Sequence, residues 1–304
     1  MPPSEKNGEC GFICRSPFAI RHLAAFSLVE VLVVVSLLSL IVLALMAVFS
    51  STQRAFRAAV TQTGVLEGSR AAMELMARDL RTLTPSYGAN DGSVNFSVVA
   101  NPAPYAPLPQ SLPGTYPVVY RTNLLNYFFM LGRQSTKWTA TGYFVDAGSS
   151  SPLYPLYRFY AETNTTASPS TLYNLFTNQI GKAQFTSANM SHLIDGVVHL
   201  TVRAYDPSGN WISPTYNYTN LPNVSTNIAS PPVGGEAQFF MFSNAVPASV
   251  EVALGVLEDP VLAHAQSLPF QSTAQSSYLA QQSGTVHLFR QHASIPNVDP
   301  TAYP

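Results

Sequence analysis

One run of apolar residues constrains this chain more than any other feature. Residues 26–49 hold a single charged side chain, that of Glu30. As an α-helix, a run of this length extends about 36 Å, which is enough to cross a hydrocarbon layer about 30 Å thick. A buried core helix rarely runs this long without a polar face, and the apolar part of a cleaved secretory signal is only about 7–15 residues long. The run therefore predicts a retained transmembrane helix.

Charge and cysteine content narrow the function classes. Only 10% of the 304 residues are charged and the formal net charge is −1, whereas an ordinary soluble domain is about 25% charged. These values exclude a highly charged disordered chain, and we expect no nucleic-acid partner. Cys10 and Cys14 are the two cysteines. One Cys-x3-Cys spacing predicts neither a disulfide scaffold nor a metal site.

Glu30 is the unusual residue of the apolar run. A carboxylate inside a membrane helix is costly, by about 2.5–3.5 kcal/mol at the bilayer centre for the comparable aspartate and by less near the interface. Such a residue usually has a partner and a function. The alternative is that its side chain reaches the lipid headgroups.

The residues around Glu30 carry a resemblance. Residues 25–33, AFSLVEVLV, resemble the processing and N-methylation motif of type IV prepilins and type II secretion pseudopilins. The resemblance implies cleavage by prepilin peptidase between Ala25 and Phe26, and N-methylation of Phe26. It also implies that Glu30 pairs with the Phe26 ammonium of a neighbouring subunit during assembly. Ala25 stands where glycine is typical of the family.

The resemblance also implies topology and partners. Residues 1–25 would be a cytoplasmic leader and residues 26–49 a single inner-membrane span. The part beyond the span would then be periplasmic or extracellular. The implied partners are prepilin peptidase and other minor pseudopilins or pilins.

The helical pattern continues over residues 50–84. Apolar residues recur at helical spacing and form one stripe, which predicts an amphipathic extension whose apolar face covers a sheet. Pro85 and Gly88 mark its end. The stripe consists of Leu66, Met73, Met76, Leu80 and Leu83.

Residues 85–258 read as short β-strands separated by turns. We expect an α+β, pilin-like fold in which the long N-terminal helix packs on an antiparallel sheet. Scattered runs within residues 121–258 also resemble J-type minor pseudopilins and the Verru_Chthon cassette protein C family. Residues 213–235 are expected to be a surface insertion. Residues 259–304 are expected to be a poorly ordered polar tail with a short helix near residues 272–282.

Catalytic and metal-binding patterns are weak. His192, Asp195 and His199 suggest a metal trio, but a turn and a strand separate their directions. Residues 206–210 offer oxygen atoms but one carboxylate, which favours a turn over a calcium site. We therefore expect no enzyme activity, no cofactor and no metal.

The leading hypothesis is a minor pseudopilin or prepilin-like structural subunit of a type II secretion or type IV pilus-like filament. The competing hypothesis is a membrane-anchored periplasmic or surface binding protein or enzyme that keeps an uncleaved signal anchor.

Overall fold

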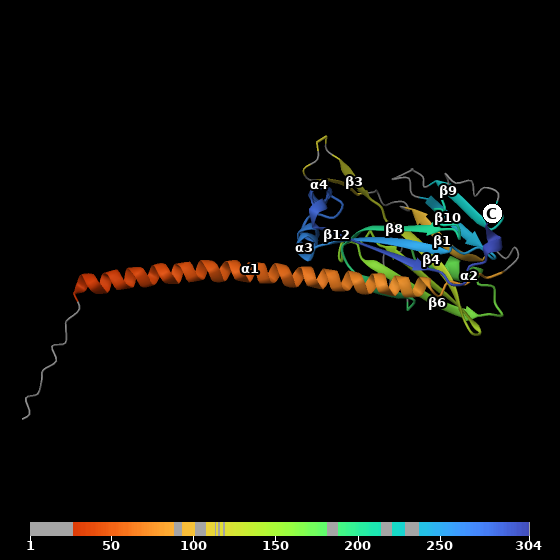
Figure 1. Cartoon of the computed structure of the whole chain (residues 1–304), viewed down its shortest axis with the longest axis horizontal. Helices are drawn as coiled ribbons and strands as arrows, with labels where there is room; N and C mark the ends of the chain where they lie inside the picture. The colour runs from red at the N-terminus through yellow and green to blue at the C-terminus, as the bar shows by residue number, and fades with distance from the viewer. Residues whose placement is uncertain are drawn as a thin grey trace, which may run out of the picture. The chain divides into compact units, whose positions relative to one another are not determined.

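The architecture is α+β, with a long N-terminal helix followed by antiparallel β-sheets (Figure 1). The chain divides into two units, Met1–Phe56 and Arg57–Pro304. The computed structural model describes residues 27–87, 93–100, 108–112, 114, 116–117, 119–180, 188–213, 221–228 and 237–303.

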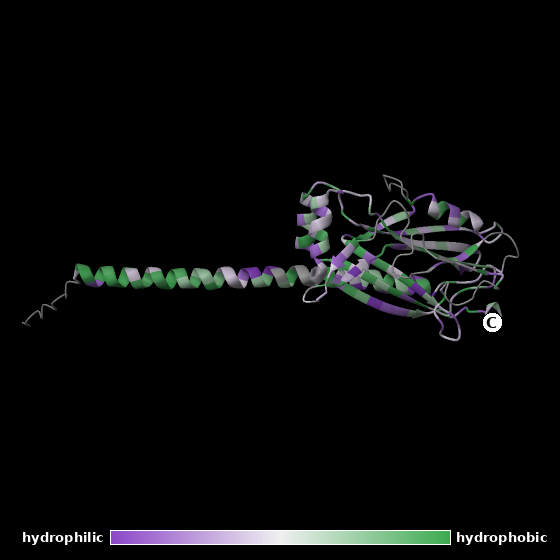
Figure 2. Cartoon of the chain, turned by 90° about the horizontal axis from the view of Figure 1, so that it is seen from above, coloured by the Kyte–Doolittle hydropathy of each residue, from purple (hydrophilic) through white to green (hydrophobic). Residues whose placement is uncertain are grey.

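Helix α1 runs over 53 residues, Leu28–Leu80. Its first part is apolar and its side chains are exposed, and Figure 2 shows the hydrophobic turns giving way to hydrophilic ones further along. The helix begins where Ser27 accepts a hydrogen bond from the backbone N–H of Glu30, at 3.2 Å. A serine in this position satisfies one of the backbone donors that a helix N-terminus leaves free.

The last turns of α1 belong to the second unit and bury one face. Met73, Met76 and Leu80 are buried as the stripe predicted, whereas Val65 is buried in place of the half-buried Leu66. The helix ends three residues earlier than the stripe indicated, because Leu83 forms a β-bridge with Gly132.

The main sheet has seven antiparallel strands in the order β7-β6-β5-β4-β1-β10-β9. Residues 127–131, 142–146 and 153–160 are runs of aromatic and branched side chains that predict strands, and they fall mostly within β4, β5 and β6. The strands are β1 Val94–Ala100, β4 Asn126–Gln134, β5 Lys137–Val145, β6 Leu156–Asn164, β7 Met190–Ile194, β9 Val224–Ile228 and β10 Ala237–Phe242.

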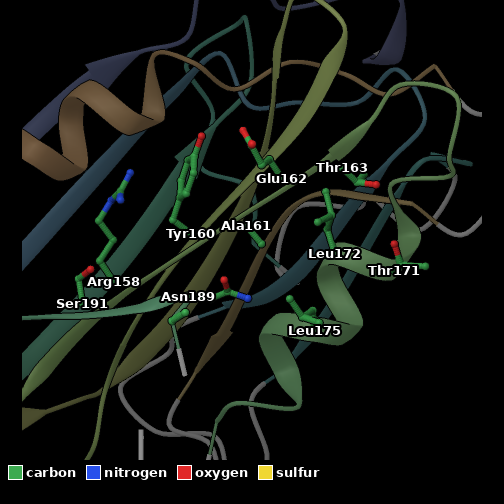
Figure 3. A pocket seen from close by; sticks show the side chains of 11 residues that line it. Arg158, Tyr160, Ala161, Glu162, Thr163, Thr171, Leu172, Leu175, Asn189 and Ser191 are labelled. Carbon is green, nitrogen blue, oxygen red and sulfur yellow. The ribbon is translucent and has the colours of Figure 1, made fainter. Parts of the chain in front are cut away.

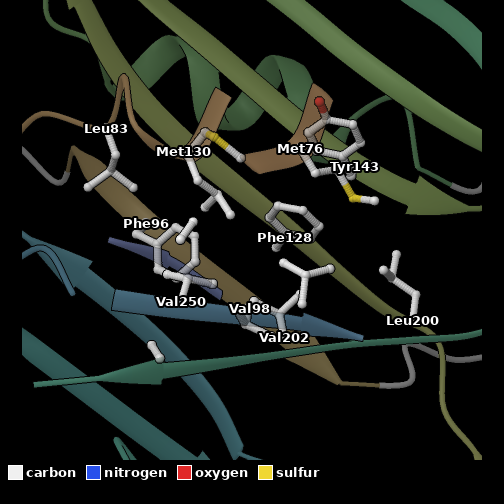
Figure 4. Packing of buried hydrophobic residues seen from close by; sticks show 14 of the residues in the cluster. Met76, Leu83, Phe96, Val98, Phe128, Met130, Tyr143, Leu200, Val202 and Val250 are labelled. Atoms are coloured by element: carbon white, nitrogen blue, oxygen red, sulfur yellow. The ribbon is translucent and has the colours of Figure 1, made fainter. Parts of the chain in front are cut away.

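A second antiparallel sheet has the order β12-β11-β8, and a short hairpin joins β2 to β3. Apolar residues of the two larger sheets and of α1 form one core, which includes Met76, Phe96, Phe128 and Val202 (Figure 4). The elements are β2 Leu108–Ser111, β3 Tyr120–Asn123, β8 Val197–Tyr205, β11 Ser249–Leu257 and β12 Val286–Ser294.

Helix α2, Ser170–Thr177, packs on the other face of the main sheet. Its buried residues, Leu172 and Phe176, join a separate aromatic cluster with Phe129 and Phe159. Gly142 makes this approach possible, because a Cβ atom at that position would lie 2.4 Å from the Phe176 ring.

The expectation of a poorly ordered tail over residues 259–304 is wrong for the described residues. Helices α3, Asp259–Ser267, and α4, Thr273–Gln281, are followed by β12, which pairs with β11 over nine residues. The β domain therefore extends beyond residue 258. The sequence of β12 reads as polar because it is an edge strand with mostly exposed or half-buried side chains.

The short helix expected near residues 272–282 is confirmed by α4. The surface insertion expected over residues 213–235 contains an edge strand of the main sheet, β9, while residues 214–220 and 229–236 lie outside the described residues.

Candidate functional site

The described residues of the expected processing and assembly motif lie at the start of α1. Ala25 and Phe26 lie outside the described residues. Glu30 is in the first helical turn and is exposed. Ser27 and Glu30 have the spacing of a capping box, and a carboxylate is favoured at the positive end of a helix dipole. The helix terminus thus stabilises the Glu30 charge locally, before any partner is considered.

The helix that follows Glu30 presents an apolar surface on all sides. Between Leu28 and Phe49 the large hydrophobic side chains are 45–81% exposed. Within Leu28–Arg57 the most apolar 18-residue window has a mean hydropathy of 3.1, and the segment is long and apolar enough to cross a membrane. The same length and composition suit a single-pass anchor or a signal sequence near the N-terminus. Exposure of so much apolar surface to water is unfavourable, so this segment requires lipid or protein around it.

A buried ionic cluster holds the end of α1 against the main sheet. Asp79 Oδ2 accepts hydrogen bonds from Tyr143 Oη at 2.6 Å and from Arg158 Nε at 2.7 Å. Burial, followed by the charge of Asp79 and its hydrogen bond, raises the pKa of Tyr143. Tyr143 therefore stays protonated and donates to the carboxylate.

Sequence reasoning missed Asp79, although a signal was present. Asp79 lies three residues after Met76 and directly before Leu80, so it falls within the apolar stripe. A charged residue is almost never fully buried unless it is paired. An acid inside an otherwise apolar stripe therefore indicates a cationic partner on the opposing sheet, which proved to be Arg158.

The candidate metal trio does not form a cluster. His192 Nε2 lies 2.7 Å from Asp195 Oδ1. His199 instead accepts a hydrogen bond from the backbone N–H of Leu124 through Nδ1, and its Nε2 lies 3.3 Å from Thr201 Oγ1. Within the described part of the chain, no group of three or more His, Cys, Asp or Glu residues is placed to hold a metal ion.

Residues 206–210 form a turn, as their sequence predicted. Asp206 Oδ1 accepts a hydrogen bond from the Asn210 backbone N–H at 2.8 Å, and Oδ2 accepts one from the Asn210 side chain at 3.2 Å. Gly209 has a positive φ of 82°, which a glycine adopts without strain. Both carboxylate oxygens of Asp206 are thus used inside the turn.

A hollow lies beside β6 and α2 (Figure 3). Its charged residues already have partners: Arg158 binds Asp79, and Glu162 forms an ion pair with Lys137. The rest of the lining combines hydroxyl and amide side chains with Tyr160 and with apolar residues, namely Thr163, Thr171, Asn189, Ser191, Ala161, Leu172, Leu175 and Ala188. This set of described residues contains no histidine or cysteine that could activate a nucleophile.

Comparison with known proteins finds no matching family profile, no matching curated protein and no matching solved structure. Any functional assignment must therefore come from the residues of this chain and their placement.

Proposed function

We propose that this protein is a minor pseudopilin or prepilin-like subunit of a type II secretion or type IV pilus-like filament. One observation carries the proposal: an acidic residue, Glu30, lies in the first turn of α1, at the start of its exposed apolar part. The motif around Glu30 adds to it, since residues 25–33 have the residue types of a prepilin processing site.

The assembly mechanism follows from electrostatics in lipid. Cleavage after Ala25 exposes a new ammonium group on Phe26. That cation and the Glu30 carboxylate are each unfavourable in a membrane, but they neutralise each other when the helices of two subunits pack side by side. Only one register of the two helices brings the charges together, so the pair selects the register as well as the partner.

The outer part of the chain supports a structural role. Helix α1 continues from its apolar part to a terminus that is buried and ion-paired within the β domain. A filament subunit needs this continuity, because the head must stay attached to the helix that assembles. In this role the protein is a substrate of prepilin peptidase and a single-pass inner-membrane protein, with its β domain periplasmic or extracellular.

N-terminal sequencing of the protein from the membrane fraction of its native host tests the proposal. The expected mature start is Phe26, carrying an N-methyl group that mass spectrometry of the first peptide detects. A chain that retains Met1 in the native host would overturn the proposal and favour the uncleaved signal anchor. A strain without prepilin peptidase is the matched control, and there the protein should keep its leader.

A further inference from the structure

Several cations lie on the outer face of the β12-β11-β8 sheet. Strand register places His199, Gly255 and Leu288 in one row across this face, and Thr201, Ala253 and Arg290 in the next. The following row contains Arg203, Glu251 and His292. Since side chains two residues apart on a strand share a face, Arg203 and Arg290 project from the same side as His199.

A third guanidinium comes from the neighbouring hairpin. Arg121 lies on β3, and the chain just after β3 binds β8 through Leu124, whose backbone N–H donates to His199 Nδ1. Burial, and then the charges of Arg121, Arg290 and Arg203, lower the pKa of His199 to about 4. His199 is therefore a neutral imidazole near pH 7, and it lies close enough to these three arginines for their charges to act on it.

Carboxylates balance only part of the positive charge of Arg121, Arg203 and Arg290. Glu251 is the one carboxylate in the described rows between Leu288 and Ser294, and it lies opposite Arg203. The Arg290 side chain is exposed and forms no ion pair with any described residue. Arg290 lies opposite Ala253 and Arg121 lies opposite Gln110, so neither arginine has a carboxylate as its partner in the strand register.

Arg121 also carries an unused donor. Its Nη2 donates to Gln110 Oε1 at 2.8 Å, but its Nε is buried and has no hydrogen-bond partner among the described residues. A buried guanidinium N–H without an acceptor is costly and points to an absent acceptor such as an ion. The planar guanidinium group suits phosphate and carboxylate oxygens.

We propose that the outer face of the β12-β11-β8 sheet binds a phosphate group, held by the guanidinium groups of Arg121 and Arg290 beside His199. A terminal phosphate carries about −1.5 to −2 charges at pH 7, which matches the two unbalanced cations better than a single carboxylate does. The phosphate can belong to a soluble phosphomonoester or to a lipid headgroup, and this site is independent of the assembly role of α1.

Isothermal titration calorimetry of the full chain in a non-ionic detergent tests this site. One arm uses glycerol 3-phosphate as the probe, and the other uses micelles containing phosphatidic acid. Binding of glycerol 3-phosphate assigns a soluble phosphate, and binding of phosphatidic acid alone assigns a lipid. Absence of binding in both arms overturns the proposal.

Matched arginine variants distinguish specific binding at this site from nonspecific electrostatic attraction to positively charged side chains on the protein surface. Arg290→Gln and Arg121→Gln should each weaken binding by about tenfold or more, as expected when one charged hydrogen bond is lost. Arg81→Gln removes the same charge from an exposed position after α1 and should leave binding unchanged. An equal loss with Arg81→Gln would contradict the proposal. Arg290 is exposed on the edge strand β12, so its replacement should not prevent folding. Arg290→Gln therefore serves as the test if Arg121→Gln fails to fold.

The neutral imidazole provides a second readout. A bound phosphate dianion should raise the pKa of His199, as followed by NMR of its ring protons during a pH titration with and without glycerol 3-phosphate. An unchanged pKa at a saturating concentration would show that the probe binds elsewhere.

Discussion

Asp79 Oδ2 lies 2.7 Å from Arg158 Nε, so the last turn of α1 is ion-paired to β6. The side chains are only 9% and 20% exposed, respectively, and Tyr143 donates a second hydrogen bond to the same oxygen. Arg158 lies on β6 and Tyr143 on β5. One carboxylate therefore fixes the helix terminus to two neighbouring strands of the main sheet.

Replacing Asp79 should weaken this attachment strongly. Asp79→Asn leaves the guanidinium of Arg158 largely buried without its counter-charge, which typically costs about 3 kcal/mol. Urea unfolding of the full chain in detergent, followed by tryptophan fluorescence, measures the loss. Glu74→Gln neutralises an exposed acid of the same helix and should change the free energy of unfolding by less than about 0.5 kcal/mol. Equal effects of the two variants would contradict a special role for Asp79.

Gly142 should tolerate no side chain. A Cβ atom there would overlap the Phe176 ring at 2.4 Å, so Gly142→Ala should destabilise the protein by about 1–3 kcal/mol through overpacking. Thermal unfolding monitored by circular dichroism measures this change. Gly64→Ala is the control and should stabilise the protein. A Cβ atom at position 64 would meet no atom within 4 Å, and alanine favours a helix over glycine by about 1 kcal/mol. A melting temperature of Gly142→Ala at or above that of the unchanged protein would show that α2 does not pack closely on β5.

Acid should destabilise the fold through His199. Its pKa in the folded protein is about 4, below the unfolded value of about 6.5, so the unfolded chain binds the extra proton first. The stabilisation is therefore complete above pH 6.5 and is lost as the pH falls toward 4, by at most about 1.4 kcal/mol per pH unit. Urea midpoints at pH 7.5 and pH 5.0 measure this loss.

The matched variant for this pH effect is His199→Asn. Its amide oxygen can still accept the hydrogen bond from Leu124 N–H, but it does not titrate. The variant should be less stable at pH 7.5 and should lose less stability between pH 7.5 and pH 5.0. Identical acid sensitivity in both proteins would assign the effect to other groups.

Glu30 should matter for assembly and not for insertion. Removing one carboxylate makes the apolar helix easier to insert, so Glu30→Ala should reach the membrane fraction in normal amounts. Loss of the charge pair should reduce its co-purification with other pilin-like subunits. Glu67→Gln changes an exposed acid of the same helix beyond the apolar part and should assemble normally. Normal assembly of Glu30→Ala would refute the charge-pairing role.

The sequence alone determined the elements whose signals are local. An apolar run with a single charge is stable only in lipid or against protein, so the first part of α1 was predictable from residues 26–49. The strands β4, β5 and β6 followed from runs of aromatic and branched residues, which favour strands. The turn at residues 206–210 followed from its Asp, Pro and Gly residues, because turn chemistry is set within a few residues.

Only the tertiary structure decided the features that depend on distant partners. Strand β12 looked like part of a polar tail because an edge strand buries few side chains, and its identity comes from backbone pairing with β11. Asp79 became a structural residue only when Arg158, 79 positions away, came within hydrogen-bond distance. The arginines around His199 come from three strands, and no local pattern brings them together. Long-range pairing of this kind leaves little trace in local sequence, since the free energy lies in contacts that form only after the sheets are assembled.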